Sequence, residues 1–158
     1  MNAIKIVSGG QTGVDRAGLD AAIALGLPYG GWVPSGRMAE DGVVPPIYEG
    51  MEEYSTPGYP ARTKANVRDS DATLILVESL PLSKGAALTL RTAENIRKPH
   101  KVVCINAEGA VEETRAWLES FQELSRPLVL NIAGPRESGC PGIQARGKEF
   151  LLKVLTSH

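Results

Sequence analysis

Cysteine is scarce in this chain, which has only Cys104 and Cys140 among its 158 residues. Two thiols are too few for the disulfide framework of a small secreted domain. Neither lies in a C-x-x-C pair or at metal-ligand spacing from a histidine, so the sequence contains no zinc or redox motif. We therefore expect reduced thiols in a cytoplasmic protein.

The chain also lacks an excess of charge and a long hydrophobic run. Its 17 basic and 18 acidic residues leave a formal net charge of -1, so no broad positive field would attract nucleic acid or an anionic membrane. No apolar run approaches the roughly 20 residues that a membrane-spanning helix needs. We therefore expect neither a nucleic-acid partner nor a membrane partner, and any bound anion must be held by local groups.

The sequence does contain a series of short apolar runs rich in Val, Ile and Leu. Their nearly continuous apolar character indicates strands that are covered on both faces, which is typical of a parallel sheet. We predict four such strands, at residues 3–8, 72–77, 101–106 and 127–132, and a fifth, weaker one at residues 29–33.

Helical patterns separate these strands. Apolar residues recur at three- and four-residue spacing over residues 14–25, 86–97, 111–124 and 143–155. This alternation predicts a single α/β domain over residues 1–158, with an open, doubly wound, mostly parallel sheet flanked by helices, as in a Rossmann-like fold. Ligands of such sheets bind at the carboxyl ends of the strands, where the strand order reverses.

The loop "SGGQTGVDRAG", which follows the first predicted strand, is rich in glycine. Glycines let a backbone approach a ligand closely, and the free amides at a helix start favour an anion such as phosphate. The candidate ligand-binding residues of this loop are Ser8, Gly9, Gly10, Gln11, Thr12, Gly13 and Arg16. The spacing G-G-x-x-G matches neither the dinucleotide fingerprint nor the P-loop, so a plain strand-to-helix turn is the alternative. Asp15 can orient a ligand hydroxyl or simply favour the positive end of the helix.

Two later loops carry similar residues. Ser83, Lys84 and Gly85 come after the strand at 72–77 and precede a helix, which makes a second possible cradle of amides. The last strand is followed by "AGPRESGCPG", in which the polar residues are Arg136, Glu137 and Ser138. We expect the three loops to converge on one edge of the sheet, although each could be an ordinary polar surface loop.

The segment at residues 34–60 is long, rich in Pro and Gly, and without a regular period. Connections of this length in a compact domain are often functional. Its Arg37, Glu40 and Asp41 can bind a ligand sugar or form a salt-bridged surface loop. Arg62 and Asn66 then share one face of a predicted short helix, which either meets an anion or is solvated.

Four separated blocks of the sequence resemble one protein family. The blocks are "SGGQTGVDRAGLDAA", "WVPSGRMAEDG", "RTKANVRDSDATLIL" and "AGPRESGCPGI". Together they resemble the molybdenum carrier proteins, a branch of the superfamily that also holds the cytokinin-activating LOG proteins and the DNA-processing protein DprA. The resemblance covers almost the whole chain.

This resemblance implies a Rossmann-like fold, a homo-oligomer (dimer or tetramer), and binding of the molybdenum cofactor or a related phosphorylated pterin or nucleotide. It implies that the glycine loop holds the phosphate of this small ligand. The further residues that it places in the same cleft are Arg37, Asp41, Arg62, Thr63, Asn66, and the loop Gly134 to Ser138.

One block departs from the pattern of the LOG enzymes. They carry P-G-G-x-G-T-x-x-E, whose glutamate serves in cleaving a glycosidic bond, whereas this chain reads "LSKGAALTLRTAE". Lys84 replaces the second glycine, and Thr89 is the nearest polar side chain where a carboxylate is needed. The sequence therefore favours a non-catalytic binding or carrier protein. A phosphoribohydrolase-like enzyme acting on a nucleotide is the alternative, and a DNA-handling module is disfavoured by the near-neutral charge.

Overall fold

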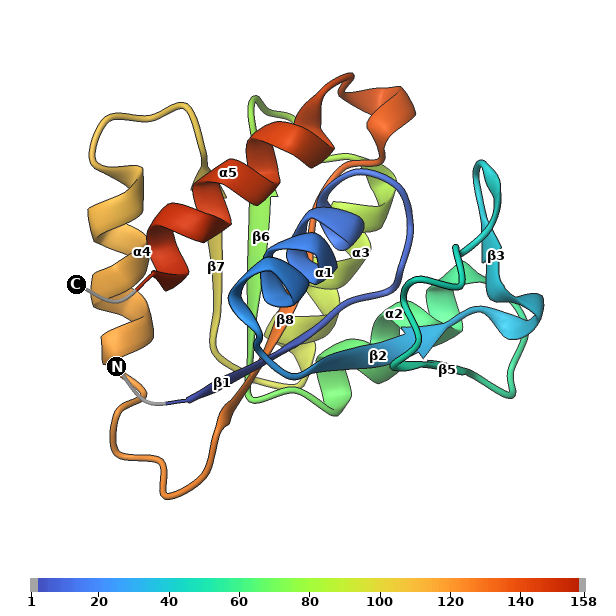
Figure 1. Ribbon diagram of the computed structural model, residues 1–158, viewed down its shortest axis with the longest axis horizontal. Helices are drawn as coiled ribbons and strands as arrows, with labels where there is room; N and C mark the ends of the chain where they lie inside the picture. The colour runs from blue at the N-terminus through green and yellow to red at the C-terminus, as the bar shows by residue number, and fades with distance from the viewer. Residues whose placement is uncertain (1–2, 157–158) are drawn as a thin grey trace.

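The computed structural model describes residues 3–156, and its centre is a six-stranded parallel sheet between two layers of helices (Figure 1). The strand order is β5-β2-β1-β8-β6-β7, and every pairing in this sheet is parallel. The strands are β1 (Ile4–Val7), β2 (Tyr29–Val33), β5 (Met51–Glu53), β6 (Ala72–Val77), β7 (His100–Cys104) and β8 (Leu128–Ala133). The predicted open, doubly wound α/β sheet is confirmed.

The helices cover both faces of the sheet. On one face α1 (Val14–Leu25) packs against α5 (Ile143–Leu155), which also contacts α4 (Ala110–Glu119). On the other face α2 (Tyr59–Arg68) packs against α3 (Lys84–Asn95), as Figure 1 shows behind the sheet. Among residues 3–156, none of these helices is long and apolar enough to cross a membrane.

Two helices differ from their predicted bounds at both ends, since α3 covers 84–95 in place of 86–97 and α4 covers 110–119 in place of 111–124. Helix α3 begins at Lys84, two residues before the predicted start, because the Ser83 hydroxyl caps it by accepting a hydrogen bond from the Ala86 N–H at 3.2 Å. Helix α4 ends at Glu119, and the residues that follow it up to 124 form turns. The apolar side chains of these turns still pack on the core, which explains why their spacing suggested a longer helix.

The central strands make the core. All of β6 is buried, and Ile6, Leu74, Leu130 and Ile132 have no exposed surface. This burial explains why β1, β6 and β8 are mostly apolar, with one polar residue each, Lys5, Thr73 and Asn131.

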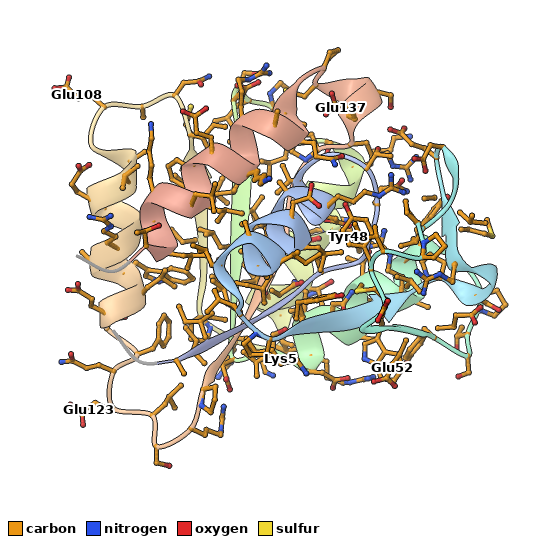
Figure 2. All side chains as sticks on the ribbon, in the orientation of Figure 1. Lys5, Tyr48, Glu52, Glu108, Glu123 and Glu137 are labelled. Atoms are coloured by element: carbon orange, nitrogen blue, oxygen red, sulfur yellow. The ribbon has the colours of Figure 1, made fainter. Side chains whose placement is uncertain are left out.

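The segment after β2 forms a small layer of its own beside the sheet. A short 3-10 helix (Ser35–Arg37) leads into an antiparallel hairpin of β3 (Met38–Ala39) and β4 (Gly42–Val43). After the hairpin comes Tyr48, which lies beside α1 (Figure 2) and donates a hydrogen bond from its hydroxyl to Asp20 of that helix at 2.6 Å. The segment that follows the hairpin is thereby fastened to the middle of α1.

The strand order reverses next to β1. The chain goes from β1 outward through β2 to β5, and then crosses through α2 to β6 on the other side. The last strand, β8, fills the place between β1 and β6. The loops after β1, β6 and β8 therefore lie at the switch point where open α/β sheets bind ligands.

Candidate functional site

A cavity of about 520 Å³ lies where β1, β6 and β8 end. Its wall is built from four segments of the chain: the first glycine loop with the start of α1, the start of α2, the start of α3, and the loop after β8. The polar or charged side chains in its lining are those of Gln11, Asp15, Tyr59, Arg62, Thr63, Ser83, Lys84, Thr89, Arg136 and Ser138. The backbones of Gly85 and Gly134 line it as well. The expected convergence of the three loops is thus found in the structure.

The backbone amides of the first glycine loop form hydrogen bonds within the protein. The N–H of Gly10 donates to the Ser8 hydroxyl (3.4 Å), and that of Gln11 donates to Asp15 Oδ2 (3.3 Å). The N–H groups of Thr12 and Gly13 donate to side-chain oxygens of Gln11 (3.1 Å) and Gln144 (3.2 Å). The Val14 N–H donates to the Pro135 carbonyl at 3.2 Å. Five consecutive amides, from Gly10 to Val14, therefore have partners within the chain, and a direct phosphate cradle on them stays a prediction.

The glycines of this loop make room for other parts of the protein. A Cβ on Gly9 would lie 1.9 Å from Nη1 of Arg62, so the guanidinium group of Arg62 lies directly against the bare backbone. A Cβ on Gly13, where φ is +84°, would lie 2.3 Å from the Pro135 carbonyl oxygen. The glycine run thus allows an arginine and a neighbouring loop to approach closely.

Arg62 and Asp15 form the charged floor of the cavity. Both are buried, with 8% and 6% of their surface exposed, and Arg62 Nη1 lies 3.6 Å from Asp15 Oδ2. Nη1 also donates to the Thr63 hydroxyl at 3.2 Å. Burial raises the pKa of the Asp15 carboxyl and lowers the pKa of the Arg62 guanidinium, because both charged forms lose hydration. Their mutual attraction opposes this loss and offsets only part of it.

The opposite wall is more open. Lys84 and Gly85, at the start of α3, are exposed, and a Cβ on Gly85 would meet nothing within 4 Å. The hydroxyl of Thr89 donates to the Gly85 carbonyl oxygen at 2.9 Å, within the same helix. The position at which a LOG-like glutamate was expected therefore faces the cavity without a carboxylate.

Arg136 reaches the cavity from the loop after β8 and lies over the ring of Tyr59. Its Cζ is 4.8 Å from the ring centroid, and the Cζ of Arg62 is 5.7 Å from the same ring. Both distances fall in the range of cation–π contacts. Tyr59 therefore holds two arginines of like charge near each other at one side of the cavity.

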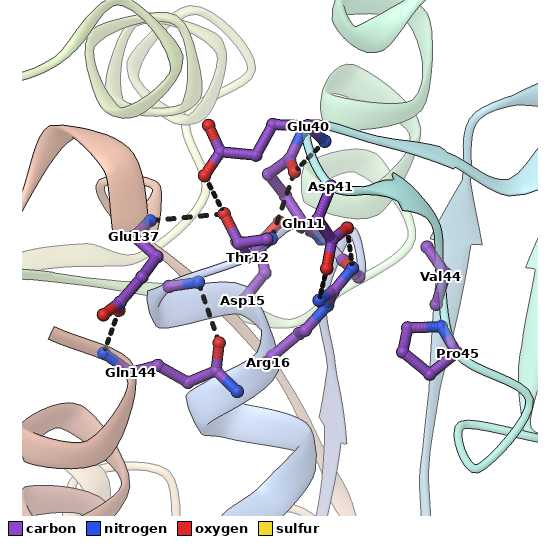
Figure 3. Close-up of polar contacts among 12 residues, drawn as sticks. Gln11, Thr12, Asp15, Arg16, Glu40, Asp41, Val44, Pro45, Glu137 and Gln144 are labelled. Atoms are coloured by element: carbon purple, nitrogen blue, oxygen red, sulfur yellow. Dashed lines mark hydrogen bonds and ion pairs between the residues drawn. The ribbon is translucent and has the colours of Figure 1, made fainter. Parts of the chain in front are cut away.

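Other predicted residues of this loop hold its shape. Glu137 caps α5, since its carboxylate accepts from the N–H groups of Gly142 (2.6 Å) and Gln144 (3.0 Å). Its own N–H donates to the Thr12 hydroxyl at 3.2 Å (Figure 3). A Cβ on Gly134 would lie 2.4 Å from the Leu76 carbonyl oxygen, so this position needs a glycine for close packing.

The β3–β4 hairpin is fastened to the first loop by two acidic side chains (Figure 3). Arg16 binds Asp41 through two hydrogen bonds, of 2.6 and 2.9 Å. The Glu40 carboxylate accepts from the hydroxyl of Thr12 and from the N–H of Ser138 at 3.2 Å. Hydrogen bonds from Ser138 and Thr12 lower the pKa of Glu40, and the bond from Arg16 lowers the pKa of Asp41.

Ten of the predicted residues lie outside the cavity lining, and they are Ser8, Gly9, Gly10, Thr12, Gly13, Arg16, Arg37, Asp41, Asn66 and Glu137. Arg37 donates to the carbonyl oxygens of Val44, Pro45 and Tyr48 at 3.2–3.3 Å. Asn66 bonds both the N–H and the carbonyl of Trp32, at 2.8 and 3.0 Å, and Ser8 donates to the Asp15 carbonyl at 2.9 Å. These contacts hold loops in place, and a direct ligand contact of these residues stays a prediction.

Sequence reasoning missed the lining residue Tyr59 and left the role of Asp15 open. Tyr59 follows Gly58 and precedes Pro60, a context that suggests a turn, yet it begins α2 and faces the cavity. An acid in the first turn of a helix, such as Asp15, commonly only stabilises the positive end of the helix dipole. The burial of Asp15 beside an arginine from α2 is visible only once the two helices are placed around the sheet.

Comparisons with known proteins agree with this architecture. The sequence profile of the family described as "Circularly permutated YpsA SLOG family" matches residues 6–155. Among curated proteins, none matches the chain significantly. A crystal structure from Syntrophus aciditrophicus SB, named "Putative molybdenum carrier protein", is 43% identical in sequence with a TM-score of 0.87. The alignment covers 98% of this chain and 97% of that one, so the resemblance carried by the four sequence blocks is confirmed.

Proposed function

Because the chain belongs to the circularly permutated YpsA SLOG family, we propose that it is a binding or carrier protein for a phosphorylated pterin or nucleotide, such as the molybdenum cofactor. The ligand would occupy the cavity between α2, α3 and the loop after β8. The name of the crystal structure that is 43% identical supports a molybdenum-related ligand.

The charge of the cavity is the observation that carries this proposal. Arg62, Lys84 and Arg136 face one acid, Asp15, so the described lining has an excess of positive charge. The cavity also includes the first turn of α3, where the positive end of the helix dipole favours an anion. A phosphate monoester, which carries about two negative charges near neutral pH, would balance this excess.

The size and the apolar part of the lining suit the ring of such a ligand. A volume of about 520 Å³ lies within the usual range of small-molecule sites. Pro60, Leu88 and Ala133 provide apolar surface, and Tyr59 provides an aromatic ring. A planar heterocycle would pack on these groups while its phosphate meets the basic side chains.

The lining fits the phosphorylated part of the molybdenum cofactor better than the metal itself. Within residues 3–156, no three His, Cys, Asp or Glu side chains are grouped to hold a metal ion. The donors in the cavity are guanidinium, ammonium, amide and hydroxyl groups, which bind phosphate. When bound, the cofactor would bring its own metal chemistry, and Arg62, Lys84 and Arg136 would bind and orient its phosphate. A cytoplasmic location and a homo-oligomer, dimer or tetramer, stay predictions.

Binding experiments with matched ligands test this function. Titration calorimetry would compare a nucleoside monophosphate and a phosphorylated pterin with their dephosphorylated forms. We expect the phosphorylated forms to bind, and the double change Lys84→Gln with Arg136→Gln to weaken binding at least tenfold. Lys64→Gln, on an exposed lysine of α2 outside the lining, is the control and should change the affinity less than twofold. Equal binding of the phosphorylated and dephosphorylated forms would refute the proposal.

A nucleotide-cleaving enzyme is the second candidate, and Asp15 is the observation that favours it. Burial raises the pKa of this carboxyl in the cavity, which is a property of catalytic acids. Against this role, Asp15 is already engaged by the Gln11 N–H and by Arg62. Release of a free base from a nucleoside monophosphate, lost in Asp15→Asn, would support the enzyme.

A further inference from the structure

Two buried donor groups at the floor of the cavity have no acceptor among residues 3–156. They are Nε2 of Gln11 and Nε of Arg62. The two residues are 4% and 8% exposed, and both line the cavity. Buried donors in folded proteins almost always have a partner, so these two point to an acceptor that is not part of the chain.

The orientation of the Gln11 amide is set by its surroundings. Its Oε1 accepts hydrogen bonds from the N–H of Thr12 at 3.1 Å and from the N–H of Glu40 at 2.8 Å. A flipped amide would place its NH₂ group against these two donors, so the oxygen must occupy this position. The NH₂ group is consequently the end without a partner, and the hairpin residue Glu40 helps to hold it there.

Arg62 is similarly constrained and carries a charge that its neighbours do not balance. Its guanidinium lies against the bare backbone of Gly9, and its Nη1 donates to the Thr63 hydroxyl. The Asp15 carboxylate is 3.6 Å away, beyond a good hydrogen bond. Arg136 adds further positive charge nearby. A second negative group is therefore favoured beside Arg62.

We propose that the floor of the cavity is an oxyanion subsite, in which Gln11 Nε2 and Arg62 Nε donate to the oxygens of one tetrahedral oxyanion. This oxyanion is either the phosphate of the bound ligand or a free inorganic anion of the same shape. The inference rests on the proposed function, because the subsite belongs to the same cavity. It assigns the anion to two side chains, whereas the amides from Gly10 to Val14 are already bonded within the protein.

Gln11→Glu is the sharpest test, because it keeps the oxygen that holds Thr12 and Glu40 and replaces the free donor by an acceptor. Titration calorimetry on the full chain would use inorganic phosphate, molybdate, a nucleoside monophosphate and the matching nucleoside. For every oxyanion that binds to the unchanged chain, we expect Gln11→Glu to weaken the affinity at least tenfold. Gln122→Glu makes the same change at an exposed position outside the cavity, and it should change the oxyanion affinity less than twofold.

Arg62→Lys provides a second variant, which keeps the positive charge beside Asp15 and removes Nε. The same loss of oxyanion affinity is expected from it, and it replaces Gln11→Glu if thermal unfolding shows that the latter no longer folds. If inorganic phosphate or molybdate binds and both variants weaken it, the subsite accepts a free anion. If only the nucleoside monophosphate binds and both variants weaken it, the subsite holds the ligand phosphate.

The failure of this subsite can be told apart from the failure of the proposed function. If the nucleoside monophosphate or an inorganic anion binds equally well to the unchanged chain and to the folded variants, the subsite is wrong. The proposed function still stands in that case when the phosphate is required for nucleotide binding. If inorganic anions bind at this subsite but no phosphorylated ligand does, the subsite stands and the proposed function fails. If nothing binds, both are overturned.

Discussion

The loops that follow β1 and β6 lie at the same edge of the sheet, and each leads into a helix, the first through Gly13 and the second into α3, whose second residue is Gly85. The first, residues 8–13, is buried, and its amides bond to the protein. The second, ending in Ser83 at the start of α3, is exposed, and Gly85 has open space around it. The glycines of a loop at the switch point therefore do not by themselves show that its amides are free to bind a ligand.

The position of each loop in the sheet explains the difference. Strand β1 lies between β2 and β8, so its loop is crossed by Arg62 from one side and by Pro135 from the other. Strand β6 lies next to the edge strand β7, and a Cβ placed on Gly85, beyond its end, would meet nothing within 4 Å. The glycines of the first loop serve close packing, and the open end of α3 remains available to a ligand.

The largest expected effect comes from an alanine at Gly13. The new Cβ would lie 2.3 Å from the Pro135 carbonyl oxygen, at a φ of +84° that alanine rarely adopts. We expect a loss of unfolding free energy on the order of 3 kcal/mol or more in a denaturant titration. Gly85→Ala, in the first turn of α3, is the control, and it should change stability by less than about 1 kcal/mol, in the stabilising direction. Equal midpoints for the two variants would contradict the contrast between the loops.

Gly9→Ala should have a smaller effect on stability and a clear effect on binding. Its Cβ would meet the guanidinium of Arg62, which is the end of a flexible side chain and can move away. We expect a loss of about 1–2 kcal/mol from overpacking. Calorimetry should show that oxyanion binding weakens along with it, because Arg62 leaves its place. A variant with normal stability and normal binding would show that Arg62 is not held by the bare backbone.

Asp41→Asn tests how firmly the hairpin is fastened to the first loop. The change leaves the buried guanidinium of Arg16 without its carboxylate, while the Asp41 side chain is 47% exposed and partly screened by water. We expect a loss of about 1 kcal/mol. The exposed pair of Glu149 and Lys153 on α5 serves for comparison, and Glu149→Gln should cost no more than about 0.5 kcal/mol. If both changes have the same effect on the unfolding midpoint, the hairpin pair is no stronger than a surface pair.

The smallest effect concerns Glu40 and depends on pH. Its pKa in the folded chain is lowered, so its bonds to Ser138 and Thr12 stabilise the fold above the ordinary glutamate value of 4.5 and are lost as the pH falls through the folded value. Glu40→Gln should therefore be less stable than the unchanged chain at pH 7, and the difference should shrink as the pH falls below 4.5. Urea titrations at pH 7 and at a series of pH values below 4.5 measure it, and a difference that does not change with pH would rule out this linkage.

Much of the fold could be predicted because it depends on local patterns. The bounds of β2, β6, α1 and α5 agree with the prediction, since apolar periodicity and flanking glycine or proline define them. The end of α4 could not be predicted, because Phe121 and Leu124 keep the apolar spacing of a helix while the backbone turns.

The sequence by itself determined the parallel α/β sheet, the family, and the edge where the three loops meet. Continuous apolar strands must be covered on both faces, and the carboxyl ends of parallel strands share one edge. Only the tertiary structure decided which groups at that edge have partners. The hairpin brings Glu40 to Gln11 and orients its amide, and α2 places Arg62 against Gly9. The members of both pairs are distant in the sequence. Whether a donor stays unpaired depends on such contacts, which no local pattern contains.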